Sequence, residues 1–188
     1  SWTIEHALDA PVDRVVVSSD SNDVLAIAGE MGALAHRRSD DLATDTARVD
    51  AALREAVAWH ERERRRIAAA VLLYGNVPVR PAGLVGRAVR LWRETGCDSV
   101  QSYAPVGKHH PLWQVRLDTD GTARPWEGER LFGGVYRRQE LPASFVPDGG
   151  VVVVSRAALF HEIEGLDPAH PHSFLGRDHR GVVSEEGA

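Results

Sequence analysis

The sequence predicts an α/β protein with a mostly parallel sheet. Short runs that are apolar on both faces alternate, over the first hundred residues, with longer segments of helical spacing. Strands that are buried on both faces are typical of parallel sheets, because crossover helices cover both sides of such a sheet. The length of 188 residues suits one domain, since chains usually divide only beyond about 250–300 residues.

The first four expected elements are a helix, a strand, a second helix and a second strand, at residues 1–8, 14–18, 22–31 and 33–36. The helices have apolar residues three and four positions apart, as Val24, Ile27 and Met31 are in the second. The strands are short apolar runs, of which R-V-V-V-S is the clearest.

The next four expected elements continue the alternation, at residues 45–64, 68–73, 81–95 and 99–103. The long third helix has one apolar face, and Thr44 or Asp45 is expected to cap it. The fourth helix has Pro81 in its first turn and Gly96 just after its end, which are favoured positions for both residues. The two strands are apolar on both faces and therefore belong in the buried sheet.

The pattern changes after Pro105. A strand at 113–117 followed by a turn predicts a hairpin outside the sheet, and the residues up to 149 are rich in Pro, Gly and Arg. The run V-V-V-V then predicts a return to a buried strand, with a short helix after it. We therefore expect an α/β core, an extension, and a return to the core with a C-terminal tail, at residues 1–104, 105–149 and 150–188.

Composition and charge exclude several classes of protein. Hydrophobic residues make up 43% and charged residues 26% of the chain, which is ordinary globular usage and not that of disordered or fibrous proteins. The apolar runs are far shorter than the roughly 20 residues of a membrane span, and no secretory signal pattern opens the chain. A net charge of −5 argues against a nucleic-acid partner. The single cysteine, Cys97, fits a cytoplasmic location.

Polar side chains follow the carboxyl ends of the first four predicted strands, at residues 18–22, 37–46, 74–80 and 106–110. Ligands of an open α/β sheet bind beyond these ends. From the residues alone, simpler interpretations stay open: a helix-cap cluster after the first strand, surface charge at Arg37 and Arg38, and turn chemistry at Tyr74-Gly75-Asn76.

Two groups of basic residues suggest an anionic ligand. His109 and His110 stand beside Lys108 at the end of a strand. A metal site is disfavoured there, because neighbouring side chains point in different directions and no third ligand is near in sequence. In the extension, the segment Y-R-R-Q-E-L-P contains Arg138 and Gln139. An arginine fork meets a carboxylate at two points, although surface charge is the simpler interpretation of this segment.

Taken together, several segments resemble the acylneuraminate cytidylyltransferases, also called CMP-sialic acid synthetases. V-V-V-S-S-D is similar to the family's strand and turn, and R-S-D-D-L-A-T-D-T to its Arg-Pro-x-x-Leu-Ala-x-Asp-Thr segment. Further segments match in the family's order and spacing, at residues 72–80, 109–111, 138–142 and 147–150. The resemblance covers roughly residues 1–160.

The resemblance implies a Rossmann-like, three-layer fold of the nucleotide-diphospho-sugar transferase type, with a small extension for dimerisation. It implies that the chain is a nucleotidyltransferase that activates a nine-carbon 2-keto sugar acid with CTP, assisted by Mg²⁺, and releases pyrophosphate. Two anions must be held in line for this transfer, which requires cations and fixed donors. A homodimer is implied as well, in which one subunit's extension helps to complete its partner's sugar pocket.

The resemblance also implies roles for particular residues. Nucleotide binding is expected of Arg38, Asp45, Thr46 and Asn76. Binding of the sugar acid is expected of Tyr74, His109, His110, Arg138 and Gln139. Y-G-N-V stands where the family has Gln-Pro-Thr-Ser, and Trp113 stands where some members have lysine. The sugar acid therefore stays open among N-acetylneuraminate, its deaminated relative and legionaminate- or pseudaminate-like acids.

Two family segments have no counterpart in this sequence: the basic loop that cradles the triphosphate and the Asp-x-Asp segment that holds Mg²⁺. The resemblance therefore implies that the phosphate contacts and the Mg²⁺ ligands lie outside this chain segment, and no catalytic residue is assigned. A non-catalytic or truncated member that binds a nucleotide or a sugar acid is the alternative. Because the family's first strand is central, we predict either a gap in the sheet or a strand supplied from elsewhere.

Overall fold

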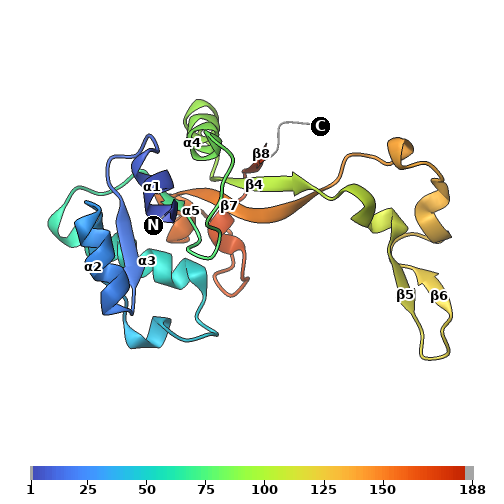
Figure 1. Cartoon of the computed structure of the whole chain (residues 1–188), viewed down its shortest axis with the longest axis horizontal. Helices are drawn as coiled ribbons and strands as arrows, with labels where there is room; N and C mark the ends of the chain where they lie inside the picture. Colours follow the sequence, from blue (N-terminus) through green and yellow to red (C-terminus); the bar gives the residue numbers. More distant parts are fainter. Residues whose placement is uncertain (1, 185–188) are drawn as a thin grey trace.

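A computed structural model describes residues 2–184 of the chain (Figure 1). Its helices are α1 (Trp2–Leu8), α2 (Asn22–Glu30), α3 (Val49–Glu63), α4 (Leu84–Thr95) and α5 (Arg156–Leu159). Its strands are β1 (Val16–Ser19), β2 (Leu34–Arg37), β3 (Ala69–Leu72), β4 (Ser99–Pro105), β5 (Val115–Leu117), β6 (Ala123–Pro125), β7 (Phe145–Ser155) and β8 (His179–Val183). None of the described helices has both the length and the apolar character needed to cross a membrane.

The core strands form two sheets. β1 pairs with β2 in parallel, and the larger sheet has the order β3-β7-β4-β8. β7 is antiparallel to both of its neighbours, whereas β8 is parallel to β4. The predicted α/β class is confirmed, but the sheet is mixed rather than mostly parallel. β7 differs because it returns from the extension directly alongside β4, which led the chain out.

The predicted gap in the sheet is confirmed at the boundary between these two sheets. Within residues 2–184, β1 has a ladder only with β2, and β3 has one only with β7. β1 contacts α2 and α3, and in Figure 1 the blue strand region between these two helices lies apart from β4 and β7. Each of the two strands therefore has one edge whose backbone groups find no ladder partner among the described residues.

The core lies on both faces of β7. Its residues Val151–Val154 are each at most 1% exposed, which explains the uninterrupted run of valines. On one face, Val151 and Val153 pack against α4, through Leu84, Val85, Ala88 and Val89. On the other face, Val154 packs against Val57 of α3 and Leu159 of α5. Helices thus cover both sides of this strand, as the three-layer fold requires.

The third helix begins later than the sequence predicted. Helix α3 starts at Val49, and the residues around Thr44 and Asp45 form a turn instead of its cap. The carboxylate of Asp50 is only 2% exposed; it accepts two hydrogen bonds from Arg48 at 2.9 Å and one from Arg54 at 2.8 Å. A buried carboxylate in the first turn also suits the positive end of the helix dipole. The ion pairs of Asp50 with Arg48 and Arg54 therefore hold this first turn.

The extension projects from the core as an arm (Figure 1). Strands β5 and β6 form the predicted hairpin, and the indole of Trp113 donates a hydrogen bond to the carbonyl of Val135 at 3.1 Å, which ties the two limbs of the arm together. Large apolar side chains remain exposed along it, namely Leu117, Trp126, Leu131, Phe132 and Tyr136. The three-part division of the chain stays a prediction, and β7 spans its second boundary.

Candidate functional site

Arg38 lies where the carboxyl ends of β1 and β2 meet. Its Nη2 donates to the carbonyl of Ser18 at 2.6 Å, and its Nε donates to the Ser18 hydroxyl at 3.3 Å. These bonds hold the guanidinium against β1 and leave Nη1 with no hydrogen bond in the described part of the chain. Arg37 points elsewhere, donating to Asn22 Oδ1 at 3.1 Å and to the carbonyl of Asp20, because successive side chains of a strand alternate between its faces.

His36 lies on the same face of β2 as Arg38, and the sequence interpretation missed it. It is 3% exposed, and its Nδ1 lies 3.1 Å from the Ser18 hydroxyl. Its ring packs against Trp59 of α3, with a distance of 5.0 Å between the ring centroids. Burial lowers the pKa of His36; the charge of Glu55 opposes this effect, and the charges of Arg38 and Arg62 add to it. A histidine within an otherwise apolar strand was the only signal in the sequence.

Asp45 and Thr46 lie in an exposed turn. The hydroxyl of Thr46 lies 3.4 Å from that of Thr44. Among the described residues, no hydrogen bond or ion pair joins Asp45 or Thr46 to Arg38. The structure therefore brings Arg38 into a defined position, and the nucleotide-binding role of the other two stays a prediction.

The loop after β3 carries Tyr74, which is half-buried, and Asn76, which is exposed. Arg80 pins this loop: its Nη2 donates to the carbonyl of Tyr74 at 2.8 Å and its Nη1 to that of Val77 at 2.6 Å. The Nε of Arg80 donates to the carbonyl of Gly150 in β7, also at 2.6 Å. Arg80 is 4% exposed, so a buried cation fixes the loop on the sheet. Burial raises the pKa of the Tyr74 hydroxyl.

Asp148 binds the amide of Gly150, the residue whose carbonyl accepts a hydrogen bond from Arg80. Its Oδ1 accepts the Gly150 amide hydrogen at 2.9 Å and the hydroxyl hydrogen of Ser102. Burial by itself would raise the pKa of Asp148, but these hydrogen bonds and one from Ser184 hold it below its usual value. Burial also lowers the pKa of Arg80, and the charge of Asp148 opposes that effect. Neither Arg80 nor Asp148 was assigned to the site from the sequence.

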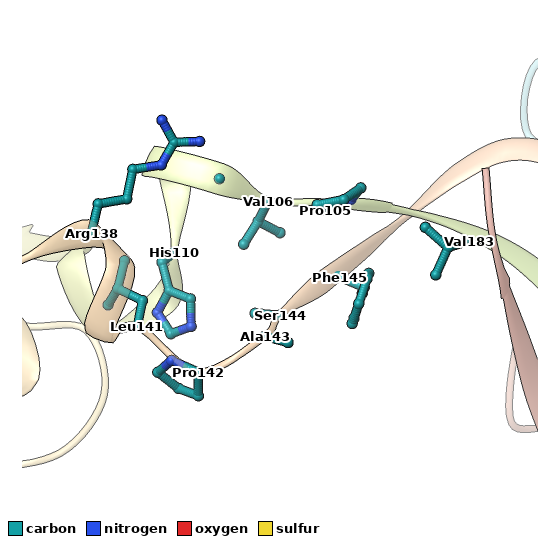
Figure 2. A pocket seen from close by; sticks show the side chains of 11 residues that line it. Pro105, Val106, His110, Arg138, Leu141, Pro142, Ala143, Ser144, Phe145 and Val183 are labelled. Carbon is teal, nitrogen blue, oxygen red and sulfur yellow. The ribbon is translucent and has the colours of Figure 1, made fainter. Parts of the chain in front are cut away.

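A cleft of about 650 Å³ opens where the arm meets the core, and His110 and Arg138 both line it. Figure 2 shows the two side chains at the arm end of this cleft, with Phe145 and Val183 toward the core. His110 is 5% exposed, and its Nδ1 accepts the amide hydrogen of Leu112 at 3.1 Å. This bond assigns the proton of the neutral ring to Nε2, which has no partner within residues 2–184.

The guanidinium of Arg138 also has no hydrogen bond or ion pair in the described part of the chain. It lies against Gly107, where a Cβ atom would come within 3.2 Å of Nη2. The backbone φ of Gly107 is +56°, which also favours glycine. Of the five residues expected to bind the sugar acid, the structure places His110 and Arg138 at this cleft. Gln139 and His109 are exposed and do not line it.

The described residues do not form a metal site. No group of three or more His, Cys, Asp or Glu side chains within residues 2–184 is placed to hold a metal ion. The Mg²⁺ that the resemblance implies is expected to take its protein ligands from outside this chain segment, and no chemical step is derived through it.

Comparison with known proteins adds the family. A family model described as cytidylyltransferase matches residues 1–109, which is more than half of the chain. Among solved structures, the chain is similar to a CMP:2-keto-3-deoxy-manno-octonic acid synthetase in complex with CTP, with a TM-score of 0.59 and 16% identity over 96% of this chain and 77% of that chain. It is also similar to the 4-diphosphocytidyl-2C-methyl-D-erythritol synthase of Anaerococcus prevotii, with a TM-score of 0.51 and 12% identity over 97% of this chain and 80% of that one. These likenesses confirm the Rossmann-like fold.

Proposed function

The chain belongs to the cytidylyltransferase family, and from that premise we propose that it activates a sialic-acid-type nonulosonic acid with CTP. The anomeric hydroxyl of the sugar acid attacks the α-phosphorus of CTP and loses its proton. The new bond joins that oxygen to the α-phosphorus, and the bond from the α-phosphorus to the bridging oxygen breaks. The products are the CMP-sugar and pyrophosphate.

The observation that carries the proposal is the cleft at the root of the arm. It places the unpaired guanidinium of Arg138 and the Nε2 donor of His110 at one cavity of about 650 Å³. Small-molecule sites commonly have volumes of about 300–1,000 Å³, and a guanidinium fork matches a carboxylate. The cleft therefore suits a sugar acid, whose carboxylate would meet Arg138.

The nucleotide is proposed to bind at the carboxyl ends of β1, β2 and β3. Arg38 is held there with its Nη1 unbonded, and the exposed side chain of Asn76 follows β3. Fixed donors at these strand ends support a polar ligand. Asp45 and Thr46 are proposed to contribute to the same site, and Tyr74 is proposed to lie on the side shared with the sugar acid.

A homodimer is proposed to bury the apolar side chains of the arm. Phe132 is 51% and Tyr136 is 92% exposed, and exposed apolar side chains gathered on one segment are typical of an interaction surface. Light scattering after size-exclusion chromatography should give a dimer for the wild type and a monomer for Phe132→Asp. Val24→Glu, on an exposed face of α2, is the matched control and should stay dimeric. A monomeric wild type would contradict this proposal.

The activity test is pyrophosphate release from CTP with a panel of sugar acids. We expect release with a nine-carbon acid and none with ATP, GTP or UTP, and the eight-carbon 2-keto-3-deoxy-manno-octonic acid belongs in the panel as the competing substrate. Arg138→Ala should raise the KM for the sugar acid far more than that for CTP. Arg137→Ala is the control, because Arg137 does not line the cleft. Equal effects of Arg138→Ala on both KM values would refute its role.

The alternative is a non-catalytic member that binds without turnover. It predicts that calorimetry detects binding of CTP or of the sugar acid, while no pyrophosphate appears with any acid of the panel. Release of pyrophosphate by the chain would exclude it. The location proposed for the protein is the cytoplasm, which the buried free thiol of Cys97 supports.

A further inference from the structure

The hydroxyl of Ser18 links His36 to Arg38. The Nε of Arg38 lies 3.3 Å and the Nδ1 of His36 lies 3.1 Å from this one oxygen. The Nε–H of arginine can only donate, so the oxygen of Ser18 accepts there. The hydroxyl proton of Ser18 is then available to His36 Nδ1. In the opposite tautomer this proton would have no acceptor among the described residues, so the bonds run from Arg38 to Ser18 and from Ser18 to His36.

The strand register produces this arrangement. Ser18 of β1 is paired directly with His36 of β2 in the parallel ladder. Arg38 follows His36 by two residues, so both side chains leave β2 on the same face. His36 is 3% exposed and held against Trp59 with an interplanar angle of 42°. A buried, neutral ring therefore stands as a fixed acceptor behind the Ser18 hydroxyl, which among the described residues is the one side-chain group that accepts a hydrogen bond from Arg38.

We propose that His36 is a positioning residue, which holds Arg38 through the Ser18 hydroxyl in the orientation that meets CTP. The inference rests on the proposed function, because it takes Arg38 as a nucleotide contact. His36 does not touch the ligand. Its acceptor fixes the hydroxyl of Ser18, the hydroxyl fixes Nε, and the Ser18 carbonyl fixes Nη2, which leaves Nη1 as the group presented to the nucleotide.

Two substitutions separate this role from simple packing. In His36→Asn, the amide oxygen can take the place of Nδ1 and keep the acceptor, but the ring contact with Trp59 is lost. In His36→Phe, the ring contact is kept and the acceptor is lost. Calorimetry with CTP should show a roughly five- to tenfold weaker affinity for the Phe variant, the effect of about one lost hydrogen bond, and near wild-type affinity for the Asn variant.

Thermal unfolding should give the opposite order, with the Asn variant less stable than the Phe variant. A residue that only packs would give the same order in both measurements. Ser18→Ala should match His36→Phe in CTP affinity, and the double variant should lose no more than either single one, since the two substitutions break the same chain of bonds. Wild-type CTP affinity in the Phe variant, or an equal loss in the Asn variant, would overturn the proposal.

A measurement without any ligand separates this inference from the proposed function. The Nε–H signal of Arg38 in a ¹H–¹⁵N spectrum can be assigned by its absence from Arg38→Lys. We expect its exchange with water to be slow in the wild type and in His36→Asn, and faster in His36→Phe and Ser18→Ala. If the wild type binds no CTP, the proposed function fails, and this exchange rate still decides whether His36 positions Arg38. Equal exchange in all four proteins would refute it.

Discussion

Replacing Arg80 by methionine should destabilise the protein by about 3 kcal/mol. The guanidinium is 4% exposed and donates to three backbone carbonyls, those of Tyr74, Val77 and Gly150, at 2.6–2.8 Å. Hydrogen bonds from charged donors contribute about 1.5–3 kcal/mol each, which sets an upper range of about 4.5–9 kcal/mol. The loop carbonyls can regain water, and removing a buried charge recovers part of its desolvation cost. Both effects reduce the expected loss of stability to about 3 kcal/mol.

The assay is urea unfolding followed by circular dichroism, with thermal unfolding as a second probe. For a chain of this size, 1 kcal/mol corresponds to about 2–4 °C in Tm, so Arg80→Met should lower Tm by about 6–12 °C. The Tm of Arg80→Lys should lie between those of the wild type and Arg80→Met, because one ammonium group cannot make the three hydrogen bonds of the guanidinium.

Arg124→Met is the matched control for this prediction. Its guanidinium pairs with Asp118 at 2.7 Å but is 67% exposed, and exposed pairs contribute at most about 1 kcal/mol. If Arg80→Met destabilises the protein no more than Arg124→Met does, the buried guanidinium does not hold the loop as described.

Three further predictions test the core and the arm. Burial would raise the pKa of Asp50, but its arginine partners hold the pKa below the ordinary value. Asp50→Asn should therefore lower the free energy of unfolding by about 2–3 kcal/mol at neutral pH. In urea unfolding, the difference between wild type and variant should shrink as the pH falls below about 4, where the carboxylate becomes protonated. A Cβ at Gly150 would lie 2.8 Å from two side chains, whereas at Gly86 nothing lies within 4 Å, so Gly150→Ala should destabilise by about 1–3 kcal/mol and Gly86→Ala should stabilise by about 0.5–1 kcal/mol. Trp113→Phe should speed hydrogen exchange in the arm but not in β7, because it removes the bond to Val135; unchanged exchange in the arm would refute that contact.

The order of helices and strands as far as α5 followed from the sequence, but β8 lies in the segment expected to be a tail, and the direction of β7 was not predicted. A run of four valines predicts a strand that is buried on both faces, and burial is the same for either direction. The direction depends on the connection, since a parallel neighbour needs a crossover of a dozen or more residues that usually contains a helix. The 105–149 segment has no helical periodicity, so the antiparallel return of β7 beside β4 was contained in the sequence and was overlooked.

The start of α3, in contrast, could not be predicted from the local sequence. The T-D-T segment offers caps that are as good locally as any the chain has, and the structure uses none of them. Asp50 is held instead by Arg48 and Arg54, and Arg48 also reaches the carbonyl of Pro171 at 3.2 Å. The two arginines that hold Asp50 thus also bond to carbonyls 123 and 105 residues away, those of Pro171 and Leu159, and no local pattern reports contacts of that length.

The same distinction separates the residues that face a ligand from those that orient them. The residues that face a ligand follow strand ends, so the sequence could find the loops that carry Arg38, Tyr74 and His110. Which residues orient them depends on the register of the paired strands. From the residues alone Arg37 and Arg38 are equivalent, and it is the pairing of Ser18 with His36 that puts Arg38 on the Ser18 face. A slip of one residue between β1 and β2 would exchange the positions of the two arginines. Because the packing of His36 against α3 holds the register, it also determines which of the two arginines lies at the site.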